Sequence, residues 1–159
     1  MKSLLLILSF LIFSSALPAA DVGPQAFVAG SLAKILESRK SKPFVLLLWQ
    51  LDCTPCLKEF RSLSGTVSQH PEFDLVLIAT DDLSNKDSVK QVLAQNHLGM
   101  VESWIFADSN AQRLRYEIDP SWYGEVPRVY FFDAAHQRTA FSGALTENQI
   151  MAWLEAIKR

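Results

Sequence analysis

Short apolar runs recur along the chain, and they predict the strands of a buried sheet. Most of these runs lack polar alternation, which is typical of strands covered on both faces in a partly parallel sheet. The last two runs flank a turn at residues 133–137, so they predict an antiparallel hairpin that Gly143 ends. The predicted strands are residues 44–49, 73–80, 103–107, 129–132 and 138–142, with a polar connection at residues 81–85.

Amphipathic stretches lie between the strands and predict helices. Their apolar residues recur at helical spacing, and Thr146 with Gln149 forms a capping box at the start of the last one. The predicted helices are residues 25–40, 54–69, 87–97, 111–118 and 147–158. This order of elements predicts an α/β fold: a central mixed sheet with an antiparallel edge and helices on both faces.

The first twenty residues follow a different pattern. Lys2 precedes an almost unbroken apolar run at residues 4–13, and mostly small residues follow at 14–20, which is the layout of a secretory signal peptide. The apolar run is shorter than the roughly 20 residues that span a bilayer, so an uncleaved anchor is the less favoured alternative. We therefore expect a signal peptide at residues 1–20 and one domain at residues 21–159. The mature protein is expected in the periplasm or another extracytoplasmic space, where disulfides persist.

Composition and charge narrow the function classes. The 159 residues are 49% hydrophobic and 20% charged, as in a globular domain with a core. The 15 basic and 17 acidic residues give a formal net charge of −2 and form no basic stripe, so the sequence predicts no nucleic-acid partner.

Cys53 and Cys56 are the two cysteines of the chain, and they lie where a predicted strand passes into a predicted helix. The unpaired N–H groups and the positive end of the helix dipole favour the Cys53 thiolate, and cysteines at such positions have pKa values of roughly 3.5–7.5 instead of about 8.5. Cys56 follows one turn later, close enough for a disulfide, and is expected to be more buried. Cys53 is therefore the predicted attacking thiol and Cys56 the resolving thiol, with Pro55 stiffening the first helical turn.

Other interpretations of the pair compete with a redox centre. A disulfide that closes a four-residue loop contributes only about 2 kcal/mol by chain entropy, which is little for a structural staple. A structural zinc site needs four ligands, and the chain has no second cysteine pair and no closely spaced histidine pair. Binding of Cu(I) by the two thiols alone stays open, since soft ligands suit that ion.

The strand ending in Trp49, the Cys53-Thr54-Pro55-Cys56 motif, and Val126-Pro127 before an apolar strand resemble a thioredoxin-fold protein. Within that superfamily the chain is most similar to extracytoplasmic TlpA/ResA-type reductases, some of which serve cytochrome c maturation. The resemblance implies a cis peptide bond at Val126-Pro127, packed against the cysteines. It also implies that the Val126 backbone pairs with an extended segment of a partner.

Several positions depart from the pattern of that group. Asp52 stands where many relatives have Trp, and its carboxylate either raises the pKa of the Cys53 thiol or caps the helix. Leu47 replaces the buried Asp of thioredoxin, so Glu59 is either a substitute for it or an exposed or salt-bridged helix residue. Arg128 follows the proline where relatives usually have Thr, and could recruit an acidic partner. Extra amino-terminal strands are not expected before residue 44.

Aromatic residues complete the predicted site. Trp49 is predicted as core or pocket wall, or else as a direct partner contact. Trp122 and Tyr123 precede the Val126-Pro127 loop and are predicted to form an apolar rim for a partner.

The resemblance implies a thiol-disulfide oxidoreductase that acts as a reductase without organic cofactor or metal. Its partners would be disulfide-containing proteins, with apocytochrome c as a candidate substrate, and a membrane thiol donor that reduces the oxidised enzyme. The alternative is a thioredoxin-fold copper chaperone or redox-regulated binding module without turnover.

Overall fold

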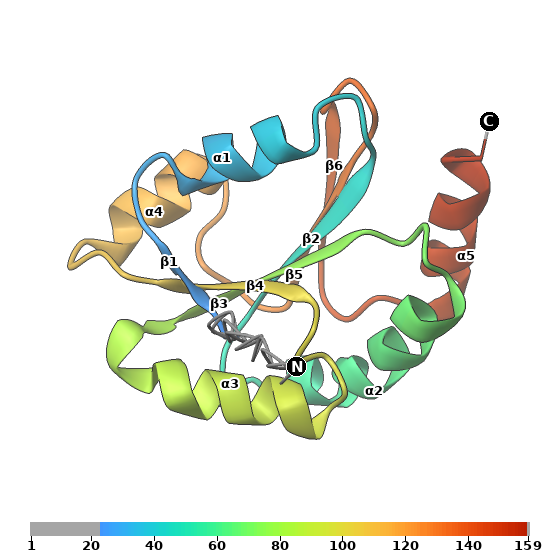
Figure 1. Ribbon diagram of the computed structural model, residues 1–159. Coiled ribbons are helices and arrows are strands. Elements are labelled where there is room, and N and C mark those ends of the chain that lie inside the picture. Colours follow the sequence, from blue (N-terminus) through green and yellow to red (C-terminus); the bar gives the residue numbers. More distant parts are fainter. Residues whose placement is uncertain (1–22, 159) are drawn as a thin grey trace, which may run out of the picture.

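A six-stranded mixed sheet forms the centre of the protein in the computed structural model, which describes residues 23–158 (Figure 1). The strand order is β1-β4-β3-β2-β5-β6. Strands β1, β4, β3 and β2 are parallel to one another, whereas β5 is antiparallel to β2 and β6 to β5. The strands are β1 (Gln25–Phe27), β2 (Phe44–Trp49), β3 (Leu75–Asp82), β4 (Glu102–Phe106), β5 (Arg128–Phe132) and β6 (Arg138–Ser142).

Helices cover both faces of the sheet, which confirms the predicted α/β architecture (Figure 1). One face packs against α2, α3 and α5, and the other against α1 and α4. The helices are α1 (Ser31–Ser38), α2 (Thr54–Gln69), α3 (Lys86–Gln95), α4 (Ala111–Ile118) and α5 (Glu147–Ala156), with a short 3-10 turn η1 (Leu83–Asn85) before α3. The predicted bounds of α2 and α4 are the observed ones, and the capping box of Thr146 and Gln149 is present.

Strand β2 lies in the middle of the sheet, and all six of its residues are buried. Because successive side chains of a strand point to opposite faces, Leu47 and Trp49 enter the core under α2, whereas Leu46 and Leu48 enter the core under α1 and α4. This double burial explains the continuous apolar run in the sequence. β2 ends at Trp49, and the loop that follows leads to the start of α2 at Thr54.

The prediction of one helix over residues 25–40 is wrong, as is the absence of a strand before residue 44. Residues Gln25–Phe27 form β1, whose Ala26 pairs in parallel with Ile105 of β4, and α1 starts only at Ser31. Gly30 has a φ of 84° and separates the two elements. The position of Phe27 is compatible with a helix as well as with a strand. Pairing with the edge of β4 makes residues 25–27 a strand.

The predicted signal peptide, residues 1–20, lies outside the described residues. Within residues 23–158, no helix has both the length and the apolar character needed to cross a bilayer.

Candidate active site at the Cys53–Cys56 disulfide

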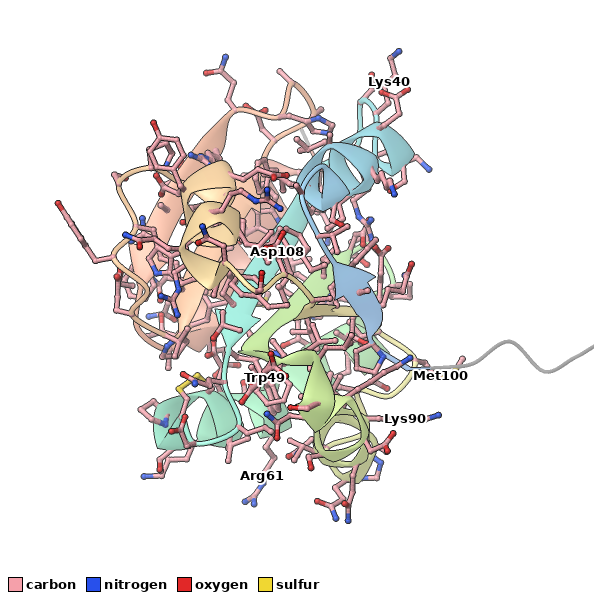
Figure 2. The ribbon with its side chains drawn as sticks, turned by 90° about the vertical axis from the view of Figure 1, so that its left-hand side faces the viewer. Lys40, Trp49, Arg61, Lys90, Met100 and Asp108 are labelled. Carbon is pink, nitrogen blue, oxygen red and sulfur yellow. A yellow bond between two sulfur atoms is a disulfide. The ribbon has the colours of Figure 1, made fainter. Side chains whose placement is uncertain are left out.

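Cys53 and Cys56 form a disulfide at the start of α2 (Figure 2). Their sulfurs are 1.99 Å apart and their Cα atoms 5.3 Å apart. Cys53 is 8% exposed and Cys56 is fully buried at 0%. Cys56 is thus more buried than Cys53, as the sequence predicts.

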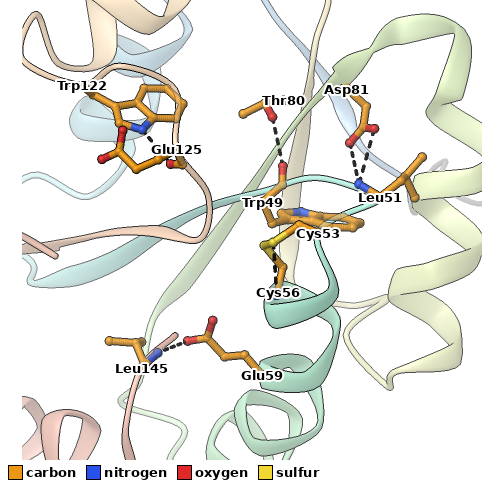
Figure 3. Close-up of a disulfide and its surroundings, with 10 residues drawn as sticks. All are labelled: Trp49, Leu51, Cys53, Cys56, Glu59, Thr80, Asp81, Trp122, Glu125 and Leu145. Carbon is orange, nitrogen blue, oxygen red and sulfur yellow. Dashed lines mark hydrogen bonds between the residues drawn. A yellow bond between two sulfur atoms is a disulfide. The ribbon is translucent and has the colours of Figure 1, made fainter. Parts of the chain in front are cut away.

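The amino end of α2 is directed at the Cys53 sulfur. Cys53 is the N-cap residue, and its Sγ accepts a hydrogen bond from the backbone N–H of Cys56 at 3.2 Å (Figure 3). Pro55 lies in the first turn, where a missing N–H costs no helical hydrogen bond. In the reduced protein, these N–H groups and the helix dipole stabilise negative charge on Cys53 more than on Cys56.

Asp52 does not cap the helix, because the cap position belongs to Cys53. The Asp52 side chain is exposed next to the disulfide. This excludes the capping interpretation. The other interpretation, a negative charge that opposes the Cys53 thiolate, is compatible with the structure but is weakened by solvent screening.

Trp49 lies behind the disulfide and is fully buried (Figure 3). Its ring packs edge-on against Phe60 of α2, with ring centroids 4.7 Å apart. The prediction that Trp49 contacts a partner directly is therefore wrong, and the core interpretation holds. Its indole Nε1 has no hydrogen-bond partner among the described residues.

Glu59 is buried on α2, one turn after Cys56, with 5% of the residue exposed. Its Oε1 accepts a hydrogen bond of 2.6 Å from the backbone N–H of Leu145, in the loop before α5, and its Oε2 has no partner among residues 23–158. Burial raises the pKa of the Glu59 carboxyl from 4.5 to about 7, although the Leu145 bond opposes the rise. The interpretation of Glu59 as an exposed or salt-bridged residue is therefore wrong.

The peptide bond between Val126 and Pro127 is cis, as the resemblance implied. Arg128 pairs with Leu48 in the antiparallel ladder of β5 and β2. The residue before it, Pro127, therefore lies beside the end of β2 that leads to the cysteines. Val126 is half-buried and packs against the core cluster that contains both sulfurs.

The loop before this proline differs from the predicted apolar rim. Trp122 is buried, and its Nε1 donates a hydrogen bond of 2.8 Å to the backbone oxygen of Glu125, so it supports the loop from inside. Tyr123 is 96% exposed. The prediction of Trp122 as a surface contact is wrong, and Tyr123 is the aromatic ring that this loop presents to solvent.

Arg128 is occupied within the protein and is not free to recruit an acidic partner. Its guanidinium contacts the Asp119 carboxylate at 3.1 Å, Glu125 at 3.4 Å and the Ser142 hydroxyl at 2.6 Å. These bonds tie the loop that contains Pro127 to the end of α4 and to β6.

The sequence pattern predicts only a strand end at Thr80 and a polar connection from Asp81, and does not reveal that both residues bond to the loop before Cys53. Strand β3 extends to Asp82, and both side chains bond to the backbone that precedes Cys53 (Figure 3). A polar pair directly after a buried strand was the only local signal.

The two sulfurs are the candidate ligands for a soft metal ion in the reduced protein. Over the part of the chain that the structure describes, no group of three or more His, Cys, Asp or Glu side chains is arranged to hold a metal ion.

No protein-family model and no curated protein sequence matches the chain. Solved structures do resemble it. A secreted Mycobacterium tuberculosis disulfide oxidoreductase, described as homologous to E. coli DsbE, superposes with a TM-score of 0.60 at 21% identity, covering 76% of this chain and 85% of that one.

Two further structures agree with this similarity. The thioredoxin domain of a thiol-disulfide oxidoreductase from Bacteroides vulgatus has a TM-score of 0.60 at 14% identity and covers 78% of this chain and 84% of its own. A secreted thiol-disulfide isomerase from Corynebacterium glutamicum has a TM-score of 0.61 at 18% identity and covers 78% of this chain and 75% of its own. These likenesses, together with the mixed sheet and the disulfide at the start of α2, show that the chain has a thioredoxin fold.

Proposed function

We propose that the chain is an extracytoplasmic thiol-disulfide oxidoreductase of the TlpA/ResA-like group, and that it reduces disulfides in other proteins. One observation carries the proposal: Cys53, which is 8% exposed, caps the amino end of α2 with its sulfur and is bridged to the fully buried Cys56. A purely structural disulfide does not need one cysteine to be more exposed than the other. Stepwise disulfide exchange does, because one cysteine attacks the target and the other resolves the mixed disulfide.

The reaction has two exchange steps. The Cys53 thiolate attacks one sulfur of a target disulfide, which forms a mixed disulfide and releases the other target sulfur as a thiolate. The Cys56 thiolate then attacks Cys53 Sγ, forms the Cys53–Cys56 disulfide and releases the second target sulfur. Two electrons pass to the target, which gains two protons, and the protein is left oxidised.

Glu59 is the proposed proton acceptor for the second step. Cys56 must lose its proton before it attacks, and it lies where water does not reach it. A buried carboxyl one turn away, with a pKa of about 7, can take up and return a proton at neutral pH. Thioredoxin has a buried Asp at the position that Leu47 occupies here, and Glu59 would perform the role of that Asp.

The partner is proposed to bind along the Val126-Pro127 loop. An extended segment of the target would pair with the Val126 backbone beside the disulfide, as an added strand does. Disulfide-containing proteins, apocytochrome c among them, are the proposed targets. A membrane thiol carrier is the proposed electron donor, and cleavage of residues 1–20 would release the domain outside the cytoplasm.

The experiment that tests this function is a trap for mixed disulfides. In Cys56→Ala, the second exchange step is blocked, so targets should stay covalently bound to Cys53 and be released by reductant. Cys53→Ala is the matched control and should trap none. Insulin reduction by the unmodified chain gives the same test in vitro. Tight Cu(I) binding by the reduced chain without any disulfide exchange would favour the copper chaperone instead.

A further inference from the structure

Strand β3 leaves its register with β4 at the level of the active site. Ala79 pairs with Ile105, but the next pair joins Asp82 to Phe106, so Thr80 and Asp81 of β3 have no counterparts on β4. Irregularities of this kind are common next to active sites, where they redirect side chains. The two residues without counterparts are the ones whose side chains turn toward the loop before Cys53.

Both side chains bond to the backbone of that loop. The Thr80 hydroxyl donates to the backbone oxygen of Trp49 at 3.3 Å. The Asp81 carboxylate accepts from the N–H of Leu51, with N–O distances of 3.1 and 3.4 Å (Figure 3). Leu51 has already left β2, so Asp81 provides the acceptor that the sheet no longer offers.

The position of Asp81 has an electrostatic cost. Asp81 is only 9% exposed, and its pKa is raised by burial, while the bond from Leu51 opposes the rise and the nearby charge of Asp52 adds to it. A second negative group at this loop also disfavours the Cys53 thiolate. The hydrogen bond from the Leu51 N–H to the Asp81 carboxylate compensates for this electrostatic cost.

We propose that Asp81, assisted by Thr80, is a positioning residue that holds the Leu51 N–H and so keeps Cys53 at the amino end of α2. Asp81 bonds to the loop rather than to either sulfur. This inference deepens the proposed disulfide exchange and rests on it for its biological meaning, although the geometry can be tested without a target protein.

The test separates the hydrogen bond from the charge. In a Cys56→Ala background, which leaves one thiol, the rate of iodoacetamide alkylation of Cys53 is measured against pH. Asp81→Asn keeps an oxygen acceptor for Leu51 and removes the charge, so alkylation at neutral pH should equal or exceed that of the background. Asp81→Ala removes the charge and the acceptor, and should be about three- to tenfold slower than Asp81→Asn, as the loss of one hydrogen bond implies.

Asp82→Asn is the matched control. Asp82 is exposed and accepts from the N–H of Ser84 in η1, so it loses the same charge one residue further on without touching the loop before Cys53. Its alkylation profile should be that of the background. Thr80→Val, which keeps the side-chain volume, should also slow alkylation of Cys53. This variant tests the positioning role if Asp81→Ala does not fold.

Hydrogen exchange reports the bond itself. The Leu51 amide should exchange about tenfold faster in Asp81→Ala than in Asp81→Asn. Equal alkylation profiles for Asp81→Ala and Asp81→Asn, or equal Leu51 exchange, would overturn the positioning role. Failure of the unmodified chain to reduce insulin, with the two variants still differing, would instead overturn the proposed function and leave the positioning role standing.

Discussion

Glu59 shows how one residue acquires a property that its type does not have in water. The helix places its carboxyl group in the core, where the N–H of Leu145 satisfies one oxygen and no described residue satisfies the other. Because the charged form is poorly solvated there, the pKa rises to about 7. A carboxyl group that titrates near neutrality is suited to proton transfer at a buried cysteine.

The raised pKa of Glu59 predicts a loss of stability as pH increases. The folded protein holds this proton up to about pH 7, whereas the unfolded chain releases it near 4.5, so the free energy of unfolding should fall between these values and level off above. In Glu59→Gln this contribution is absent. From pH 5 to pH 8, the variant should gain about 2–3 kcal/mol relative to the unmodified protein in urea unfolding.

Glu155→Gln, an exposed change on α5, is the control for this measurement and should follow the unmodified protein. Parallel pH profiles for Glu59→Gln and the unmodified protein would show that the carboxyl titrates normally.

Among the helices, strands and loops around the disulfide, side-chain hydrogen bonds and ion pairs stabilise the helix ends and the loops, rather than the backbone hydrogen bonds that join strands. Cys53 caps α2 with its sulfur, and the capping box of Thr146 and Gln149 starts α5 directly after the loop that binds Glu59. Arg128 fastens the loop before β5. The disulfide therefore lies among segments whose geometry depends on a few polar contacts.

Loss of the α5 cap should have a modest effect. Thr146 Oγ1 accepts from the N–H of Gln149 at 3.3 Å, and the Gln149 side chain accepts from the N–H of Thr146 at 2.9 Å. We expect Thr146→Ala to lower the free energy of unfolding by about 1 kcal/mol. Ser68→Ala, an exposed change in α2, should stay within about 0.5 kcal/mol; equal effects would mean that the cap contributes nothing.

Loss of the Arg128 contacts should have a larger effect. The carboxylate of Asp119 is buried, and Arg128→Ala removes one of its charged partners while Tyr130 remains bonded to it. We expect a decrease of about 2–4 kcal/mol in the free energy of unfolding, measured with urea. Arg61→Ala, on the exposed side of α2, is the matched loss of an arginine and should change stability little.

At the scale of the whole molecule, the sheet separates two cores, and the disulfide belongs to the margin of one of them. Strand β2 contributes buried side chains to both cores, and one of these cores also contains Cys53 and Cys56. Most of the apolar side chains in both cores lie outside the four-residue loop that the disulfide closes.

Reduction of the disulfide should leave the protein folded. A four-residue loop gives a chain-entropy contribution of about 2 kcal/mol, so the reduced protein should keep its far-UV circular dichroism and lose no more than that amount in urea unfolding. Leu46→Ala, which removes a fully buried side chain of β2, should cost about 2–5 kcal/mol and serves as the comparison. Unfolding on reduction alone would identify the disulfide as a structural staple.

Features that depend on local pattern could be predicted from the order of the amino acids alone. Helical periodicity set the bounds of α2 and α4, a continuous apolar run set β2, and the spacing of Cys53 and Cys56 at a strand-to-helix junction placed the disulfide. Each of these is a property of neighbouring residues, because hydrogen bonding within a helix and capping of its end involve groups at most a few positions apart.

Features that depend on distant residues were established by tertiary contacts. Glu59 accepts a hydrogen bond from a loop residue 86 positions away, and Asp81 lies 30 positions from the amide that it binds. Residues 25–27 became a strand because the edge of β4 was open to them. The periodicity of a segment does not indicate which distant groups will contact its side chains. The burial and hydrogen bonds of these residues could therefore be known only from the folded structure.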